Sequence, residues 1–179
     1  MTRWCFPDNT VLCNFASIDR LDLLRTVLDG RGRWTEAVAY EARSSALAAH
    51  PRLADVLLEG WLGEPLVIDM EEEADQVERV RRAAFGGTAA RPLQHLGEAQ
   101  TLHVIRNWQD FKESIWLSDD RAACDFAERQ GITTWRTKDV MAHGCSRGGI
   151  SPLQAFALLQ QMRSQGRSLD VPPTAQHLR

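Results

Sequence analysis

The chain has 179 residues, of which 44% are hydrophobic and 25% charged, and its formal net charge is −3. This length suits a single domain around one core, and the composition is ordinary for a globular protein. No apolar run approaches the roughly 20 residues of a membrane-spanning helix. The apolar start at Trp4-Cys5-Phe6 is interrupted by Pro7 and Asp8, which argues against a signal peptide. We therefore expect a cytoplasmic protein without membrane contact.

Charge and cysteine content narrow the functional classes further. Proteins that bind nucleic acid without regard to sequence are usually basic, so the acidic balance argues against a large nucleic-acid footprint. A nuclease stays open, because carboxylates that bind a metal ion make a protein acidic by themselves. The cysteines, Cys5, Cys13, Cys124 and Cys145, are scattered and form no C-x-x-C pair. We expect reduced thiols rather than disulfides or a zinc site.

In the first half of the chain, short apolar runs alternate with helical patterns. Residues 3–8 favour a buried strand that ends near Pro7, because proline has no N–H for a ladder. The periodicity predicts helices over 9–15, 19–28, 35–49, 51–61 and 70–85, with short strands over 31–34 and 66–68. Asp19 and Thr35 are the expected caps of the second and third helices.

The second half continues the alternation. Helices are predicted over 97–108, 121–130, 137–145 and 152–165, and strands over 114–118 and 132–135. The alternation predicts an α/β fold with a doubly wound, mainly parallel central sheet flanked by helices. We expect one domain over residues 1–166. Residues 167–179 carry Pro172-Pro173 and are expected to form a loosely ordered tail.

Four acidic positions stand beside predicted breaks in structure. Asp8 follows the first strand and Asp119-Asp120 follows a later one, whereas Glu41 and Glu98 lie near the starts of helices. In doubly wound sheets, ligands bind outside the carboxyl ends of the strands. Any one of these acids alone would be a surface group or a helix cap. Their combination makes them candidates for a single site.

The order and context of these acids resemble the PIN-domain family. The motifs are Asp8-Asn9-Thr10-Val11-Leu12 after a strand, Val38-Ala39-Tyr40-Glu41 on a helix, Gly97-Glu98-Ala99 at a helix start, and Ser118-Asp119-Asp120-Arg121-Ala122-Ala123 after a strand. The likeness covers about residues 3–165 and extends to small prokaryotic PIN proteins, including VapC-type toxins of toxin–antitoxin pairs. It implies a three-layer α/β/α, PIN-like fold.

The resemblance also implies roles for individual residues. Asp8, Glu41, Glu98 and Asp120 match the family's catalytic, metal-binding acids. The family's pattern of a hydroxyl residue, any residue and then Asp favours Asp120 through Ser118, while Asp119 stays open as a metal ligand.

One further residue takes a supporting role in the same resemblance, and the sequence itself suggests roles for several arginines. Thr10 matches a hydroxyl residue that orients the first acid or a metal-bound water. Arg121 either contacts the scissile phosphate or pairs with Asp125 one helical turn on. The stripe Arg79, Arg81 and Arg82 either binds phosphate or forms an exposed face paired with the preceding glutamates. Pro7, directly before Asp8, departs from the family pattern and could displace that acid.

The implied function is cleavage of phosphodiester bonds in RNA by a Mg²⁺- or Mn²⁺-dependent ribonuclease, the toxin of a toxin–antitoxin pair. Both cations are hard and prefer carboxylate and water oxygens, and they activate bound water for attack on phosphate. The partners implied are RNA, a cognate antitoxin protein and a second copy in a homodimer. One alternative is a catalytically weak PIN-like scaffold acting through protein or nucleic-acid binding. A phosphatase is less favoured, because Asp8-Asn9-Thr10 lacks the second Asp of a D-x-D nucleophile motif.

Overall fold

A parallel sheet of three short strands lies at the centre of the computed structural model, which describes residues 3–179. The strands are β1 (Cys5–Pro7), β2 (Ile115–Leu117) and β3 (Thr133–Trp135), in the order β1-β2-β3. Phe6 pairs with Trp116, which pairs in turn with Thr134. The carboxyl ends of all three strands therefore meet at one edge of the sheet, as predicted for a doubly wound fold.

Pro7 keeps the register of β1. It lies opposite Leu117, and the next backbone N–H, that of Asp8, donates to the carbonyl oxygen of Leu117 (2.8 Å). The ladder thus continues across the position where proline lacks a donor. Asp8 is delivered directly to the carboxyl edge of the sheet.

The strands predicted over 31–34 and 66–68 are wrong in extent. Only isolated bridges form there, between Cys5 and Gly32 and between Thr35 and Leu66. Neighbouring residues limit the length of both segments. Thr35 is the N-cap of a helix that follows the first segment, and Pro65, before the second, has no N–H to donate to a ladder.

Helices form the remainder of the fold. They are α1 (Asn9–Ser17), α2 (Leu21–Leu28), α3 (Glu36–Ala48), α4 (Leu53–Glu59), α5 (Glu71–Phe85), α6 (Leu96–Asn107), α7 (Arg121–Arg129), α8 (Thr137–Ser146) and α9 (Pro152–Ser164), with short 3-10 turns at Gln109–Phe111 and Ala175–Leu178. Thr35 caps α3 as predicted. Within residues 3–179, no helix has the length and apolar character needed to cross a membrane.

The predicted cap of α2 is wrong. Arg20, not Asp19, precedes the helix, and Asp19 has a left-handed backbone with φ of 54°. The Asp19 carboxylate instead pairs with Arg52 across the start of α4 (2.9 Å). This pairing links two helices that are not consecutive in the chain, so periodicity alone could not have shown it.

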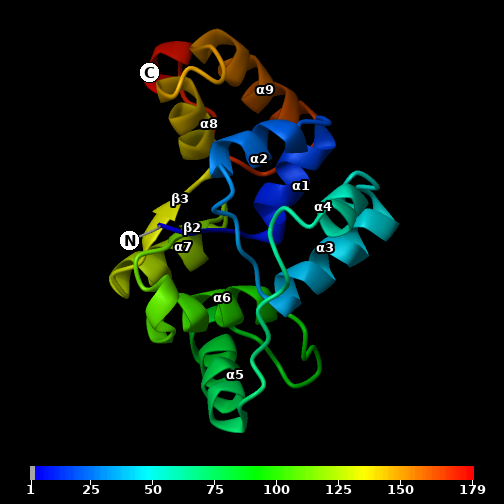
Figure 1. Cartoon of the computed structure of the whole chain (residues 1–179), viewed down its shortest axis with the longest axis vertical. Coiled ribbons are helices and arrows are strands. Elements are labelled where there is room, and N and C mark those ends of the chain that lie inside the picture. Colours follow the sequence, from blue (N-terminus) through cyan, green and yellow to red (C-terminus); the bar gives the residue numbers. More distant parts are fainter. Residues whose placement is uncertain (1–2) are drawn as a thin grey trace.

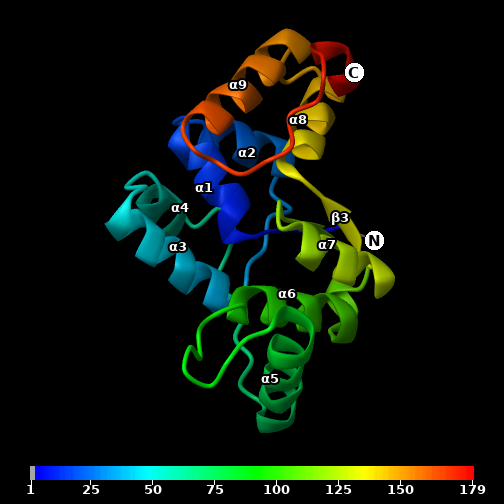
Figure 2. The ribbon, with the colours of Figure 1, turned by 180° about the vertical axis from the view of Figure 1, so that it is seen from behind.

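Successive strand residues face opposite layers of helices, because side chains alternate across a sheet. Cys5, Ile115 and Leu117 pack into a core with α1, α2, α8 and α9, whereas Phe6 and Trp116 pack into a second core with α6 and α7. Figures 1 and 2 show α8 and α9 on one side of the strands and α5 and α6 on the other. The result is the expected three-layer α/β/α fold.

The segment after Gly166 packs against the domain, in contrast to the loose tail that its prolines suggested. It leaves the end of α9 and runs back to α8 (Figure 2). Arg167 Nε donates to Asn14 Oδ1 of α1 (2.8 Å), and Leu178 is buried in the first core. The burial of Leu178 and the hydrogen bond of Arg167 hold this segment in place at both ends.

Candidate functional site

Asp8 is the most buried of the candidate acids, with only 4% of its surface exposed. It caps α1, because the Asn9 N–H donates to Asp8 Oδ1 (2.8 Å). The hydroxyls of Thr10 (2.9 Å) and Ser118 (3.3 Å) both donate to Asp8 Oδ2. Three donors and the positive end of a helix dipole therefore hold this carboxylate in one orientation at the carboxyl edge of the sheet.

Glu41 and Glu98 approach Asp8 from α3 and α6. The two helices pack closely at Gly97, where an added Cβ would lie only 2.9 Å from Glu41 Oε1 and 3.1 Å from Val38 Cγ2. Any larger residue at position 97 would push the Glu41 carboxylate aside. Glu98, one residue on, is half-buried, and its Oε1 lies 3.1 Å from His95 Nδ1.

The three acids interact electrostatically. Burial, and then the charge of Glu98, raise the pKa of Asp8 to about 6, although the hydrogen bonds from Thr10, Asn9 and Ser118 oppose the shift. Burial raises the pKa of Glu41 to about 8, with further contributions from the charges of Asp8 and Glu98. Carboxylates from β1, α3 and α6 therefore share one electrostatic environment, in which their charged forms repel one another.

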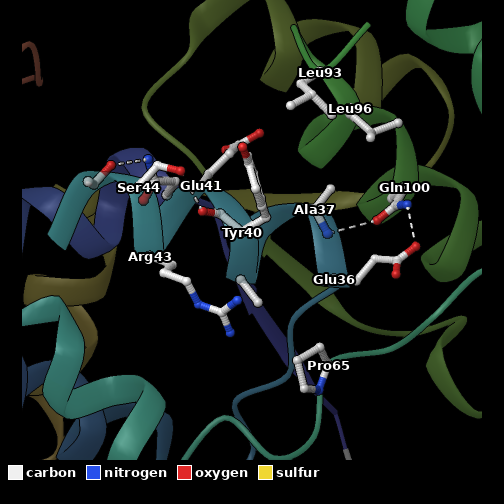
Figure 3. A pocket seen from close by; sticks show the side chains of 13 residues that line it. Glu36, Ala37, Tyr40, Glu41, Arg43, Ser44, Pro65, Leu93, Leu96 and Gln100 are labelled. Carbon is white, nitrogen blue, oxygen red and sulfur yellow. Dashed lines mark hydrogen bonds between the residues drawn. The ribbon is translucent and has the colours of Figure 1, made fainter. Parts of the chain in front are cut away.

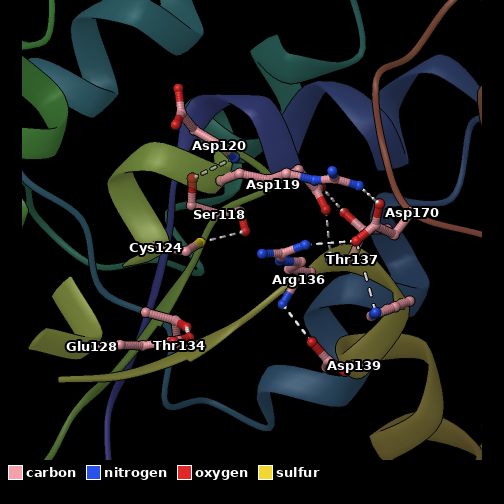
Figure 4. A network of polar contacts seen from close by, with 12 residues as sticks. Ser118, Asp119, Asp120, Cys124, Glu128, Thr134, Arg136, Thr137, Asp139 and Asp170 are labelled. Carbon is pink, nitrogen blue, oxygen red and sulfur yellow. Dashed lines mark hydrogen bonds and ion pairs between the residues drawn. The ribbon is translucent and has the colours of Figure 1, made fainter. Parts of the chain in front are cut away.

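Asp119 and Asp120 point in different directions (Figure 4). Asp119 Oδ1 accepts from the Thr137 N–H (3.1 Å), and Asp119 Oδ2 accepts from Asn14 Nδ2 (2.7 Å) and from the Thr137 hydroxyl. Asp120 is exposed and caps α7, with Oδ1 accepting from the Ala123 N–H (2.9 Å). Asp119 is thus engaged in the fold through both oxygens, whereas Asp120 keeps Oδ2 for another partner.

Arg121 does not form the predicted pair with Asp125. Its side chain is 73% exposed and pairs with Asp170 of the C-terminal segment (2.7 Å), which also accepts from Arg136 (2.6 Å). These two hydrogen bonds lower the pKa of Asp170 to about 2. Arg121 therefore helps to hold residues 167–179 against the domain.

The acids fit a hydrated cation better than a closed ligand cage. Within residues 3–179, no three His, Cys, Asp or Glu side chains lie close enough together to form a metal-binding group. Direct ligation by all four acids at once is therefore not seen, and the prediction that Asp8, Glu41, Glu98 and Asp120 hold a cation directly or through water stays a prediction. Mg²⁺, however, usually keeps several of its waters and needs only one or two carboxylates. Asp8, Glu41 and Glu98 supply the oxygen donors that such a hydrated cation prefers.

A family model described as a PIN domain matches residues 6–178. This chain belongs to the PIN-domain family. The match spans all four acidic positions and the C-terminal segment that follows Gly166. PIN domains are in general nucleases and typically use divalent metals. No curated protein and no solved structure matches the chain.

Asn14 of this PIN domain was missed in the sequence. It is 1% exposed in α1 and joins two distant segments, because it donates to Asp119 Oδ2 and accepts from Arg167 Nε. An asparagine at an inward position of an apolar helix is a usable signal, since a buried amide needs partners. Its partners, more than 100 residues away, could not be read from the sequence.

Arg81 was also misjudged, because it is buried rather than on an exposed face, although its expected pairing with a preceding glutamate does form. Only 1% of its side chain is exposed, and it pairs with Glu78 (2.6 Å). Its guanidinium also donates to three carbonyl oxygens of the loop between α5 and α6, at Thr88 (3.2 Å), Arg91 (3.1 Å) and Gln94 (3.1 Å). This loop leads into the helix that carries Glu98. The arginine therefore fixes the path of the chain into one wall of the site.

Replacing Arg81 should loosen this loop far more than replacing its neighbour. Arg81→Met leaves three carbonyls without their donor and should lower the free energy of unfolding by at least about 2 kcal/mol. Urea denaturation measures this loss, and hydrogen exchange should show faster exchange over residues 86–95. Arg82→Met is the matched control, because Arg82 pairs with the same Glu78 but is 54% exposed and should cost less than about 1 kcal/mol. Equal losses in the two variants would contradict this role.

Proposed function

We propose that this PIN domain is an endoribonuclease that cleaves phosphodiester bonds in RNA with the help of Mg²⁺ or Mn²⁺. The observation that supports the proposal most is the buried Asp8 carboxylate at the carboxyl end of β1, coupled electrostatically to Glu41 and Glu98. Buried acids that repel one another destabilise the fold unless something offsets their charge. A divalent cation is the simplest such partner, and functional sites are where such shifts cluster.

The proposed metal donors are Asp8, Glu41, Glu98 and Asp120, directly or through water. When bound, the cation neutralises phosphate charge and lowers the pKa of a coordinated water. Asp120 is favoured over Asp119 as the fourth donor, because Asp119 already accepts hydrogen bonds at both oxygens. The Ser118 hydroxyl connects Asp120 to Asp8 at the carboxyl edge of the sheet, since it accepts from the Asp120 N–H (3.2 Å) and donates to Asp8.

The residues of the chain itself contribute orientation and proton exchange. Thr10 and Ser118 restrict the Asp8 carboxylate to one rotamer, so it need not reorganise when substrate binds. In the metal-free protein, the raised pKa of Glu41, about 8, favours the protonated carboxyl near neutral pH, and a bound cation would release that proton. Gly97 keeps the space that the Glu41 carboxylate occupies.

Asp8→Asn should abolish RNA cleavage with the fold intact. The amide keeps the size of the side chain but loses the charge that attracts the cation, so we expect the cleavage rate to fall by about two orders of magnitude or more. The measurement is cleavage of a labelled single-stranded RNA in Mn²⁺ and in Mg²⁺, with circular dichroism as the check on folding.

Asp69→Asn is the matched control, because Asp69 is exposed and lies in the segment before α5, outside the acid cluster formed by Asp8, Glu41 and Glu98. It should cleave as the wild type does. If Asp8→Asn cleaves RNA at the rate of Asp69→Asn, the assignment of the acids is wrong. A wild type that is inactive with both cations would favour the alternative function, a catalytically weak scaffold.

The toxin role is a separate part of the proposal and rests on the resemblance to VapC-type proteins. We expect a cytoplasmic toxin with an RNA target, a cognate antitoxin and a homodimeric form. Expression of the wild type in bacterial cells should slow growth, expression of Asp8→Asn should not, and a small neighbouring reading frame should restore growth. Harmless overexpression of an enzyme that is active in vitro would reject the toxin role and leave the nuclease activity standing.

A further inference from the structure

A pocket of about 640 Å³ opens along α3, next to the acid cluster. Glu41 belongs to its lining, so the pocket is continuous with the proposed catalytic site. Figure 3 shows α3 on one side and the beginning of α6 on the other. Its volume lies in the range of pockets that bind small molecules or single groups of a larger ligand. Its location suggests that it receives part of the substrate.

The walls of this pocket are suited to a flat ring. Tyr40 lies one residue before Glu41 and is 52% exposed, although large aromatic side chains are usually more buried. Leu93, 51% exposed, and Leu96 line the side formed by the start of α6. Bases of single-stranded RNA stack on exposed aromatic side chains in this way. The pocket therefore offers stacking and apolar contact to a nucleobase.

The polar end of the pocket holds a carboxylate in a fixed position. Gln100 is buried, and its Oε1 accepts from the Ala37 N–H (3.1 Å). That bond determines the orientation of the amide, so Gln100 Nε2 must face and donate to Glu36 Oε1 (3.1 Å). Figure 3 shows this chain of contacts at one end of the pocket. The second oxygen of Glu36 and the remaining lone pair of the first can accept from a ligand.

A carboxylate can only accept hydrogen bonds, so it favours a base whose edge presents donors. Guanine presents two adjacent donors on its Watson–Crick edge, N1–H and the N2 amino group, which match the two oxygens of a carboxylate. Adenine and cytosine each place a ring acceptor beside their amino group, and uracil flanks its single N–H with two carbonyls. We propose that this pocket binds a guanine base, with Tyr40 stacked on the ring and Glu36 accepting from N1–H and N2–H.

The position of the pocket gives the proposal a consequence for cleavage. The guanine-binding proposal rests on the proposed function, because it assumes that Glu41 belongs to the catalytic site. A guanine held against Tyr40 would lie next to the nucleotide whose phosphate reaches the acids. Arg43 lines the same pocket, is exposed, and supplies a positive charge for the adjoining phosphate. Cleavage would then be directed to sites near a guanine in single-stranded RNA.

Glu36 has a simpler explanation that the experiment must exclude. It is the first residue of α3, where an acidic side chain is stabilised by the helix dipole. Glu71 occupies the same position in α5 and is exposed. The pair Glu36→Gln and Glu71→Gln therefore separates base recognition from helix stabilisation. Tyr40→Ala and Leu47→Ala form a second pair, since Leu47 is on the same helix, is 86% exposed and does not line the pocket.

The test is nucleotide binding to the full chain carrying Asp8→Asn, which removes cleavage from the measurement. Each of the four 5′-mononucleotides is titrated in turn while NMR follows the side-chain amide of Gln100. Guanosine monophosphate should shift these signals and bind roughly tenfold or more tightly than the other three. Adding Glu36→Gln should remove the preference, and Tyr40→Ala should weaken binding of all four. Glu71→Gln and Leu47→Ala should change neither.

Equal binding of the four nucleotides, no binding, or a preference that survives Glu36→Gln would overturn the proposal. A tetranucleotide containing one guanine distinguishes RNA from a free nucleotide as the source of the base. If RNA is the ligand, it should bind more tightly than guanosine monophosphate through its added phosphates, whereas equal affinities would indicate a free guanine nucleotide. Guanine binding by a chain that cleaves no RNA would reject the proposed function alone, and cleavage without guanine binding would reject the pocket alone.

Discussion

The Asp8 carboxylate has almost no contact with solvent, so the protein itself must stabilise its charge. The end of β1 makes this possible, because the next residue begins α1 and its N–H donates to the carboxylate. Thr10, the second residue of α1, and Ser118, just after β2, complete the set of donors. The parallel pairing of β1 with β2 brings Ser118 to Asp8 across 110 residues of sequence. The orientation of Asp8 therefore depends on the pairing of β1 with β2.

These donors do not fully offset the cost of charge at this edge. The pKa of Asp8 stays raised, and that of Glu41 is raised further, because burial and the neighbouring acids disfavour the charged forms. The fold nevertheless keeps the acids together, since Gly97 allows α6 to approach α3. A protein selected for stability alone would gain by replacing one of them. Their presence together fits the proposed site, which a cation and a negatively charged substrate would complete.

Much of the geometry of the candidate site could be predicted from the sequence, because it depends on local transitions, whereas the catalytic and metal-binding roles of its residues stay predictions. Asp8 and Thr10 follow an apolar run that gives way to a helix, and the hydroxyl of Ser118 lies beside a pair of acids at a strand end. The residues that were missed depend on long-range contacts. Asn14 and Arg81 look like ordinary helix residues until their partners on other segments are known. The same limit explains the C-terminal segment, whose prolines suggested a loose tail although its contacts with the domain hold it in place.

The central claim is that burial and the charges of Asp8 and Glu98 raise the pKa of Glu41, and that a bound divalent cation offsets this repulsion. The most direct measurement is the titration of the Glu41 side-chain carboxyl carbon by NMR, in metal-free protein and again with Mg²⁺. The account predicts a pKa of about 8 without metal, well above the ordinary 4.5 of a glutamate, and a clear fall when Mg²⁺ binds. A Glu41 pKa near 4.5 in the metal-free protein, or a raised pKa that Mg²⁺ leaves unchanged, would contradict it.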